Sequence, residues 1–80
     1  MRVEVRLYAT LASARPDLRA GEPMTLQLGE QTPLADLLRR LSLPAQAVHL
    51  AIVNGRLVHD HSHVLYDGDR VGLFPPIGGG

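Results

Sequence analysis

The sequence predicts an α+β fold in which one main helix packs across a small mixed sheet. Three observations support this class: short apolar–polar alternations lie near both ends of the chain, one stretch carries leucines at helical spacing, and turn-forming residues separate these segments. The chain has 80 residues, which is enough for one domain with a modest core. We assign residues 1–76 to that domain and residues 77–80 to a flexible glycine-rich C-terminal tail.

Two strands are predicted in the N-terminal part of the chain. Residues 2–8 alternate between apolar and polar side chains, and the same alternation returns at residues 24–28. The intervening segment 9–22 contains a proline, a glycine and scattered arginines, so it is too polar and broken to form a strand. We expect a long loop there, with one helical turn over Thr10–Ala14.

One helix is predicted in the middle of the chain. Thr32 followed by Pro33 is typical of a helix start, because a hydroxyl caps the first turn and proline suits the first helical position. Leucines then recur at the spacing of a single helical face, which predicts a helix of about ten residues: Leu34, Leu37, Leu38 and Leu41. Pro44 ends the helix, and a short turn is expected over Ala45–Val48.

Three further strands are predicted in the C-terminal part. Residues 49–53 are nearly all apolar, which is typical of a central strand. Asn54-Gly55 predicts a tight hairpin turn of type I′, in which both central residues need a positive φ. A short return strand follows at residues 56–58, another turn at 67–69 and the last strand at 71–74.

The expected element order is strand, strand, helix, strand, short strand, strand. The right-handed crossover rule allows the strand after the helix to lie parallel to one of the first pair. A helix on one face of this sheet would bury its leucines against the apolar faces of the strands. We interpret the arrangement as a β-grasp, ubiquitin-like fold.

Composition excludes several classes of function. Eight arginines balance eight acidic residues, so the charge gives no support for binding nucleic acid. Cysteine is absent, which excludes disulfides, zinc–thiolate sites and thiol nucleophiles. No apolar run reaches the length of a membrane span, and the first strand is too charged for a signal peptide. We therefore expect a cytoplasmic protein that binds another protein and no membrane.

The end of the chain is the main candidate for a functional site. Pro75 and Pro76 fix φ and favour an extended chain, and the glycines that follow have no Cβ, so this end suits a narrow channel. Its tip is the carboxylate of Gly80; the plain alternative is a frayed tail. Phe74 falls on the open face of the last strand, where it would anchor a partner. The alternatives for Phe74 are covering the edge of the core or packing on Pro76.

Histidines at alternate positions form a second candidate site: His59, His61 and His63. If this segment were extended, the three imidazoles would share one face and could chelate a metal. The alternative, which we favour, is a solvated loop without a metal, because no cysteine or carboxylate cluster completes a tetrahedral set. The serines lack a nucleophile motif, and the terminal glycines do not open a helix as a phosphate-binding loop does.

Taken together, these segments resemble the ubiquitin-like sulfur carriers of the MoaD/ThiS type, namely the small subunit of molybdopterin synthase and the thiamine-pathway sulfur carrier. The resemblance covers essentially the whole chain, and the tail is most similar to the molybdopterin branch. It rests on Leu7-Tyr8-Ala9, the helix from Thr32 to Leu41, Val53-Asn54-Gly55, the run from Asp67 to Val71, and Phe74-Pro75-Pro76-Ile77-Gly78-Gly79-Gly80.

The resemblance implies a carrier without catalytic side chains of its own. An adenylating enzyme, using ATP, would activate the carboxylate of Gly80, and a sulfur donor such as a cysteine desulfurase or a rhodanese would convert it to a thiocarboxylate. Gly78 and Gly79 would enter the partner's active site. Phe74, Pro75, Pro76 and Ile77 would lie at the docking surface of a larger molybdopterin synthase subunit. The carrier would bind no cofactor itself.

Three features depart from the family pattern: the long loop at 9–22, the histidines at 59–63 and the extra glycine at position 78. They leave the pathway open, because thiamine synthesis, tRNA thiolation and secondary metabolism also use such carriers. Two further alternatives remain. One is a β-grasp binding module that is never activated and uses its open sheet face or its histidines, and the other is a modifier conjugated to target lysines.

Overall fold

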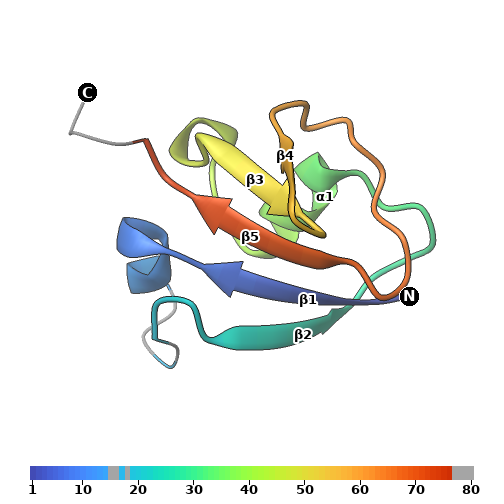
Figure 1. The fold of residues 1–80 in the computed structure, drawn as a ribbon, viewed down its shortest axis with the longest axis horizontal. Coiled ribbons are helices and arrows are strands. Elements are labelled where there is room, and N and C mark those ends of the chain that lie inside the picture. The colour runs from blue at the N-terminus through green and yellow to red at the C-terminus, as the bar shows by residue number, and fades with distance from the viewer. Residues whose placement is uncertain (15–16, 18, 77–80) are drawn as a thin grey trace.

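The computed structural model describes residues 1–14, 17 and 19–76 (Figure 1). Five strands and one α-helix form the fold, with two short 3₁₀ helices, η1 and η2. In chain order the elements are β1 (Arg2–Leu7), η1 (Ala9–Ala14), β2 (Pro23–Gln27), α1 (Leu34–Arg40), η2 (Ala45–Ala47), β3 (Leu50–Val53), β4 (Arg56–Val58) and β5 (Arg70–Phe74). The structure thus confirms the expected order of strands and helix. No helix among these residues is long and apolar enough to cross a membrane.

The strands form one mixed sheet in the order β2-β1-β5-β3-β4. β1 pairs antiparallel with β2 and parallel with β5, while β3 pairs antiparallel with both β5 and β4. β3, the strand after the helix, runs in the same direction as β2, as the crossover rule allows, but it does not pair with β2, and the parallel neighbour of β1 is β5. In this place the fully buried Val71 and Leu73 of β5 lie beside Val5 and Leu7 of β1, at the centre of the sheet.

The core lies between the sheet and α1, which crosses behind it in Figure 1. The leucine stripe of the helix is buried as expected, and it meets the inward side chains of the central strands. The largest fully buried side chains are Val3, Val5, Leu7, Leu34, Leu37, Leu38, Leu65, Val71 and Leu73. The apolar residues that alternate along the strands and those that recur every three to four residues along the helix therefore form one core between two layers.

The start of α1 differs from the expected one. The N-cap is Pro33, with an extended ψ of 154°, and no side chain caps the helix. The hydroxyl of Thr32 instead donates to the carbonyl of Gly29 at 2.6 Å. The N–H groups of Leu34 and Ala35, which have no partner within the helix, donate to the backbone carbonyls of His63 and His61, both at 2.8 Å. A distant segment therefore caps the helix, which spans seven residues rather than the expected ten or so.

The predicted turns are confirmed. Asn54 and Gly55 have φ values of 52° and 83°, which is the positive pair that a type I′ hairpin needs. Gly68 also has a positive φ, 86°, in the turn before β5. The helical turn expected over residues 10–14 is present as η1, and the one after Pro44 as η2.

Candidate functional site

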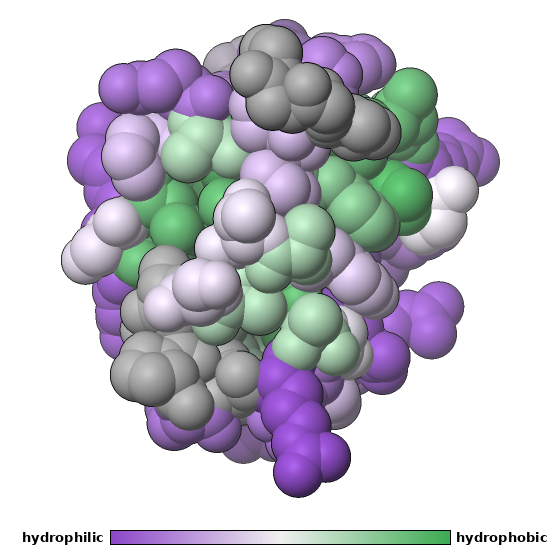
Figure 2. Space-filling view, turned by 90° about the vertical axis from the view of Figure 1, so that its left-hand side faces the viewer, coloured by the Kyte–Doolittle hydropathy of each residue, from purple (hydrophilic) through white to green (hydrophobic). Residues whose placement is uncertain are grey.

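The candidate site lies at the end of the sheet where β1 and β5 finish (Figure 1). β5 leads directly into Pro75, which is half-buried, and Pro76, which is exposed. Figure 2 views this end of the molecule and shows hydrophobic and polar residues side by side on its surface. The other tail residues predicted for the site lie outside the described residues: Ile77, Gly78, Gly79 and Gly80.

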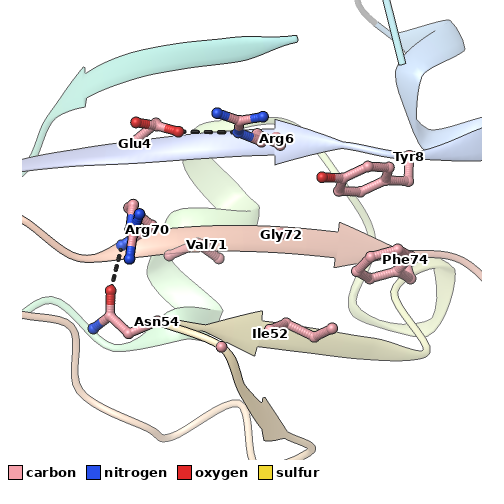
Figure 3. A pocket seen from close by; sticks show the side chains of 10 residues that line it. Glu4, Arg6, Tyr8, Ile52, Asn54, Arg70, Val71, Gly72 and Phe74 are labelled. Atoms are coloured by element: carbon pink, nitrogen blue, oxygen red, sulfur yellow. Dashed lines mark hydrogen bonds and ion pairs between the residues drawn. The ribbon is translucent and has the colours of Figure 1, made fainter. Parts of the chain in front are cut away.

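An aromatic stack marks the base of the tail. The rings of Tyr8 and Phe74 lie parallel, with 4.4 Å between their centroids and 2° between their planes (Figure 3). Phe74 lies on the outer face of the sheet, meaning the face turned away from α1, and does not belong to the described core cluster. The predicted orientation of Phe74 is therefore confirmed, whereas its partner Tyr8 was not foreseen. Alternation already placed Tyr8 on that face, and the parallel pairing of β1 with β5 brings the two rings together.

Gly72 provides the space for this stack. A Cβ built on Gly72 would lie 3.3 Å from Cε2 of Tyr8 and 3.5 Å from Cε1 of Phe74. The first distance is tighter than most Cβ contacts, so a larger residue would push against both rings. The absence of a side chain on Gly72 thus lets the aromatic pair lie flat across β5.

Backbone hydrogen bonds hold the base of the tail from both sides. The N–H of Tyr8, at the end of β1, donates to the carbonyl of Leu73 at 3.1 Å. The N–H of His49, just before β3, donates to the carbonyl of Phe74 at 2.8 Å. Because the neighbouring strands fix the last residues of β5, the direction in which the chain leaves the sheet is set by the fold.

A shallow hollow of about 280 Å³ extends from the stack along the outer face. Its floor is apolar and its rim is charged, and in Figure 3 the side chains come from β1, β3 and β5. It is lined by Glu4, Arg6, Tyr8, Ile52, Asn54, Gly55, Arg70, Val71, Gly72 and Phe74.

Hydrogen bonds order the rim of this hollow. Arg6 donates from Nε to the carboxylate of Glu4 at 3.0 Å, and the backbone N–H of Arg70 donates to Oδ1 of Asn54 at 2.9 Å. Register places Ile52 opposite Gly72 on β5 and opposite Leu57 on β4, so the apolar floor continues to the edge of the sheet. An apolar centre with a charged rim suits a protein partner better than a small polar substrate.

The histidine segment does not have the extended geometry that the candidate metal site required. The chain turns at His61 and Ser62, so the extended form that would align the three imidazoles is absent. Within the described part of the chain, no group of three metal-ligating side chains could hold an ion. His59 instead lies edge-on to His49, with 6.3 Å between ring centroids. His61 and His63 contribute through their backbone carbonyls, which cap α1.

Asp60 holds this turn together. The backbone N–H and the hydroxyl of Ser62 both donate to Oδ1 of Asp60, at 2.9 and 2.7 Å. These bonds, aided by the nearby His63 and His61, hold the pKa of the Asp60 carboxyl below its usual value. The segment thus forms a structural turn that supports the helix start.

Comparison with solved structures confirms the ubiquitin-like β-grasp fold. A Pyrococcus furiosus protein assigned as molybdopterin-converting factor subunit 1 is 23% identical, with a TM-score of 0.71 over 96% of this chain and 99% of its own. SAMP1 of Haloferax volcanii is 21% identical, with a TM-score of 0.73 over all of both chains.

A third similar structure belongs to the protein–protein complex of subunits 1 and 2 of the molybdopterin-converting factor of Helicobacter pylori 26695. It is 24% identical to this chain, with a TM-score of 0.61 over the full length of both. None of the curated proteins gives a significant match. The model of the ThiS family matches residues 5–80, from the middle of β1 through the glycine tail, and on this match the chain belongs to the ThiS family.

Proposed function

We propose that this protein is a sulfur carrier whose C-terminal Gly80 is converted to a thiocarboxylate. The observation that carries the proposal is the family match, which runs to Gly80 and so includes the tail together with the fold. The central strand β5 leads straight into that tail, and the Tyr8–Phe74 stack lies beside the point where it leaves. The fold thus supports a carrier that presents its end to other proteins.

The chemistry would take place on the C-terminal carboxylate. A carboxylate is a poor electrophile until one of its oxygens becomes part of a leaving group. An adenylating enzyme would join the Gly80 carboxylate to AMP with release of pyrophosphate from ATP. The persulfide of a sulfur donor, such as a cysteine desulfurase or a rhodanese, would then displace AMP and form an acyl disulfide. A thiol would reduce this bond, forming a disulfide with the donor's cysteine and releasing the thiocarboxylate. Because the chain has no cysteine, its sulfur would be carried by the C-terminus alone.

The proposed partners share one docking surface. The outer face around Phe74 would rest on the adenylating enzyme and, later, on the larger subunit of molybdopterin synthase, with Pro75, Pro76 and Ile77 continuing along that surface. Gly78 and Gly79 would pass into the partner's active site, since glycine needs the least room there. Similarity to chains of molybdopterin-converting factors, one of them in a complex of two subunits, supports molybdopterin as the acceptor pathway.

Intact mass spectrometry tests the carrier function directly. We expect incubation with ATP, the adenylating enzyme and a sulfur donor to replace one oxygen by one sulfur, with the change located at Gly80. A variant with one alanine added after Gly80 is the matched control and should gain no sulfur. If an enzyme that is active on its own carrier leaves the protein unmodified, the proposal is wrong and the non-activated binding module takes its place.

The pathway needs a separate experiment. The purified thiocarboxylate form is mixed with the larger molybdopterin synthase subunit and its pterin precursor, and in a parallel sample with the thiamine thiazole synthase. We expect the thiocarboxylate to return to the carboxylate only in the first sample. Turnover in the second sample alone would assign the carrier to thiamine synthesis.

A further inference from the structure

The free edge of β4 carries backbone groups that the fold leaves without a partner. β4 is the last strand of the sheet and pairs only with β3. The N–H of Asn54 donates to the carbonyl of Arg70, so this position at the end of β3 faces β5. Because successive residues of a strand face opposite neighbours, Val53 and Ala51 bond to Arg56 and Val58 of β4. The N–H and C=O of the residue between those two, Leu57, therefore point away from the sheet.

The next residue with outward backbone groups is His59. The β3–β4 register, extended by one position, places His59 opposite Leu50. The contact between the His59 and His49 rings shows that the chain still runs beside the start of β3 at this point. Among the described residues, the backbone bonds outside the strand ladders include none from Leu57 or His59. The side chain of Leu57 is also 58% exposed, and among the described residues only one other large hydrophobic side chain, that of Tyr66, is as exposed.

We propose that two copies of this protein pair antiparallel along these edges, with Val58 of one copy opposite Val58 of the other. In this register Leu57 lies opposite His59 of the second copy, so the outward N–H and C=O groups of both residues are satisfied. Arg56 then lies opposite Asp60 of the second copy, and the two-fold axis makes this pair twice. The edge is thus complementary to itself in hydrogen bonds and in charge.

The charges select this register over its neighbours. Registers centred on Leu57 or on His59 also satisfy outward backbone groups, but they place Arg56 opposite Val58 or opposite Ser62. Arg56 forms no ion pair with another described residue. Ser62 occupies only Oδ1 of Asp60, which leaves Oδ2 for a guanidinium. Both members of the proposed pair are therefore available.

The dimer would leave the candidate site open. Directly opposite residues of antiparallel strands point to the same side of a sheet, so the two-fold axis stands perpendicular to it. The outer faces of both copies then lie on one side, and the two apolar floors meet at Leu57. Neither the Tyr8–Phe74 stack nor Pro75 takes part in the pairing, so the inference does not depend on the sulfur-carrier proposal.

Charge reversal tests the pairing. Sedimentation equilibrium of the full chain, up to concentrations on the order of 1 mM, measures the dimer dissociation constant. Arg56→Glu and Asp60→Arg each create two like-charge pairs in their own dimers, so each should raise that constant about tenfold or more. Mixing the two variants restores both opposite-charge pairs, and a heterodimer with wild-type affinity should form. That recovery also shows that both variants fold.

A second measurement tests the backbone pairing. The amides of Leu57 and His59 should exchange with solvent more slowly as protein concentration rises, while the amide of Asn54 should not change. Leu57→Pro removes one outward N–H without removing a β3–β4 bond and should abolish the dimer. A protein that stays monomeric throughout the concentration range would overturn the proposal. So would single charge variants that dimerise as tightly as the wild type.

Discussion

Gly72 shows how a single residue controls the surface at the base of the tail. We expect Gly72→Val to separate the Tyr8 and Phe74 rings, because even a Cβ at this position would approach Tyr8 to 3.3 Å. Overpacking of this kind costs about 1–3 kcal/mol of stability. Ring-current shifts of the aromatic protons and urea unfolding measure the two effects.

Gly29→Ala is the matched control, since its Cβ would meet only the Thr32 hydroxyl at 3.8 Å, an ordinary contact. Unchanged ring signals in Gly72→Val would contradict the role assigned to Gly72. Alternation in the sequence was enough to predict which face carries Phe74. It did not predict the Tyr8 partner or the need for glycine between them, because both follow from the parallel alignment of β1 and β5.

A second residue-scale prediction concerns Asp60. Its pKa is lowered in the folded protein, so the stabilisation from the Ser62 bonds is present above the unfolded pKa and is lost as pH falls through the folded pKa. We expect the Ser62 amide signal in NMR to shift with a midpoint below the usual range for aspartate. Asp60→Asn should remove that transition, and a Ser62 shift that persists in this variant would assign it to another group.

At the scale of a secondary-structure element, α1 shows which features a local sequence pattern can predict and which it cannot. The leucine stripe predicted the buried face of α1, since it depends only on local periodicity. Thr32 and Pro33 predicted the wrong cap, because the N–H groups of the helix bond to carbonyls nearly 30 residues later in the chain, at His61 and His63. No local pattern marks such a contact. The apolar Leu65 beside the histidines was the available signal, and it is completely buried.

This capping predicts a contrast between neighbouring residues. His61→Ala and His63→Ala should change stability by less than about 0.5 kcal/mol, because their carbonyls cap the helix whatever the side chain. Leu65→Ala should cost about 2–5 kcal/mol, since it empties a completely buried site that anchors the same segment. Chemical denaturation compares the three variants. A loss in His63→Ala as large as that in Leu65→Ala would show that the imidazole itself supports the fold.

Across the whole molecule, stability should fall from the centre of the sheet to its edges. β1 and β5 pair with strands on both sides, whereas β2 and β4 each have one neighbour. We expect the amides of Arg6 and Val71, which face each other's strand in the central β1–β5 pair, to exchange most slowly and those of β2 and β4 much faster, as measured by hydrogen exchange at low protein concentration. Faster exchange in β5 than in β2 would mean that the base of the tail opens before the edge of the sheet.

The strand order was the part of the architecture that the sequence left open. The elements and the β-grasp interpretation followed from periodicity and turn chemistry. The crossover rule, however, did not determine which later strand would lie parallel beside β1. The structure places β5 there, where its apolar face lies beside that of β1. The tail residues from Ile77 to Gly80 stay predictions, because they lie outside the described residues.

The pairing of β1 with β5 also determines when the Tyr8–Phe74 surface forms as the chain is synthesised and folds. Tyr8 is made long before Phe74, so the surface that they share exists only when both residues have been made and β1 has paired with β5. A truncated or misfolded chain lacks that surface. If the proposed function holds, an adenylating enzyme that contacts the stack before it reaches Gly80 would therefore act only on chains that are complete and folded.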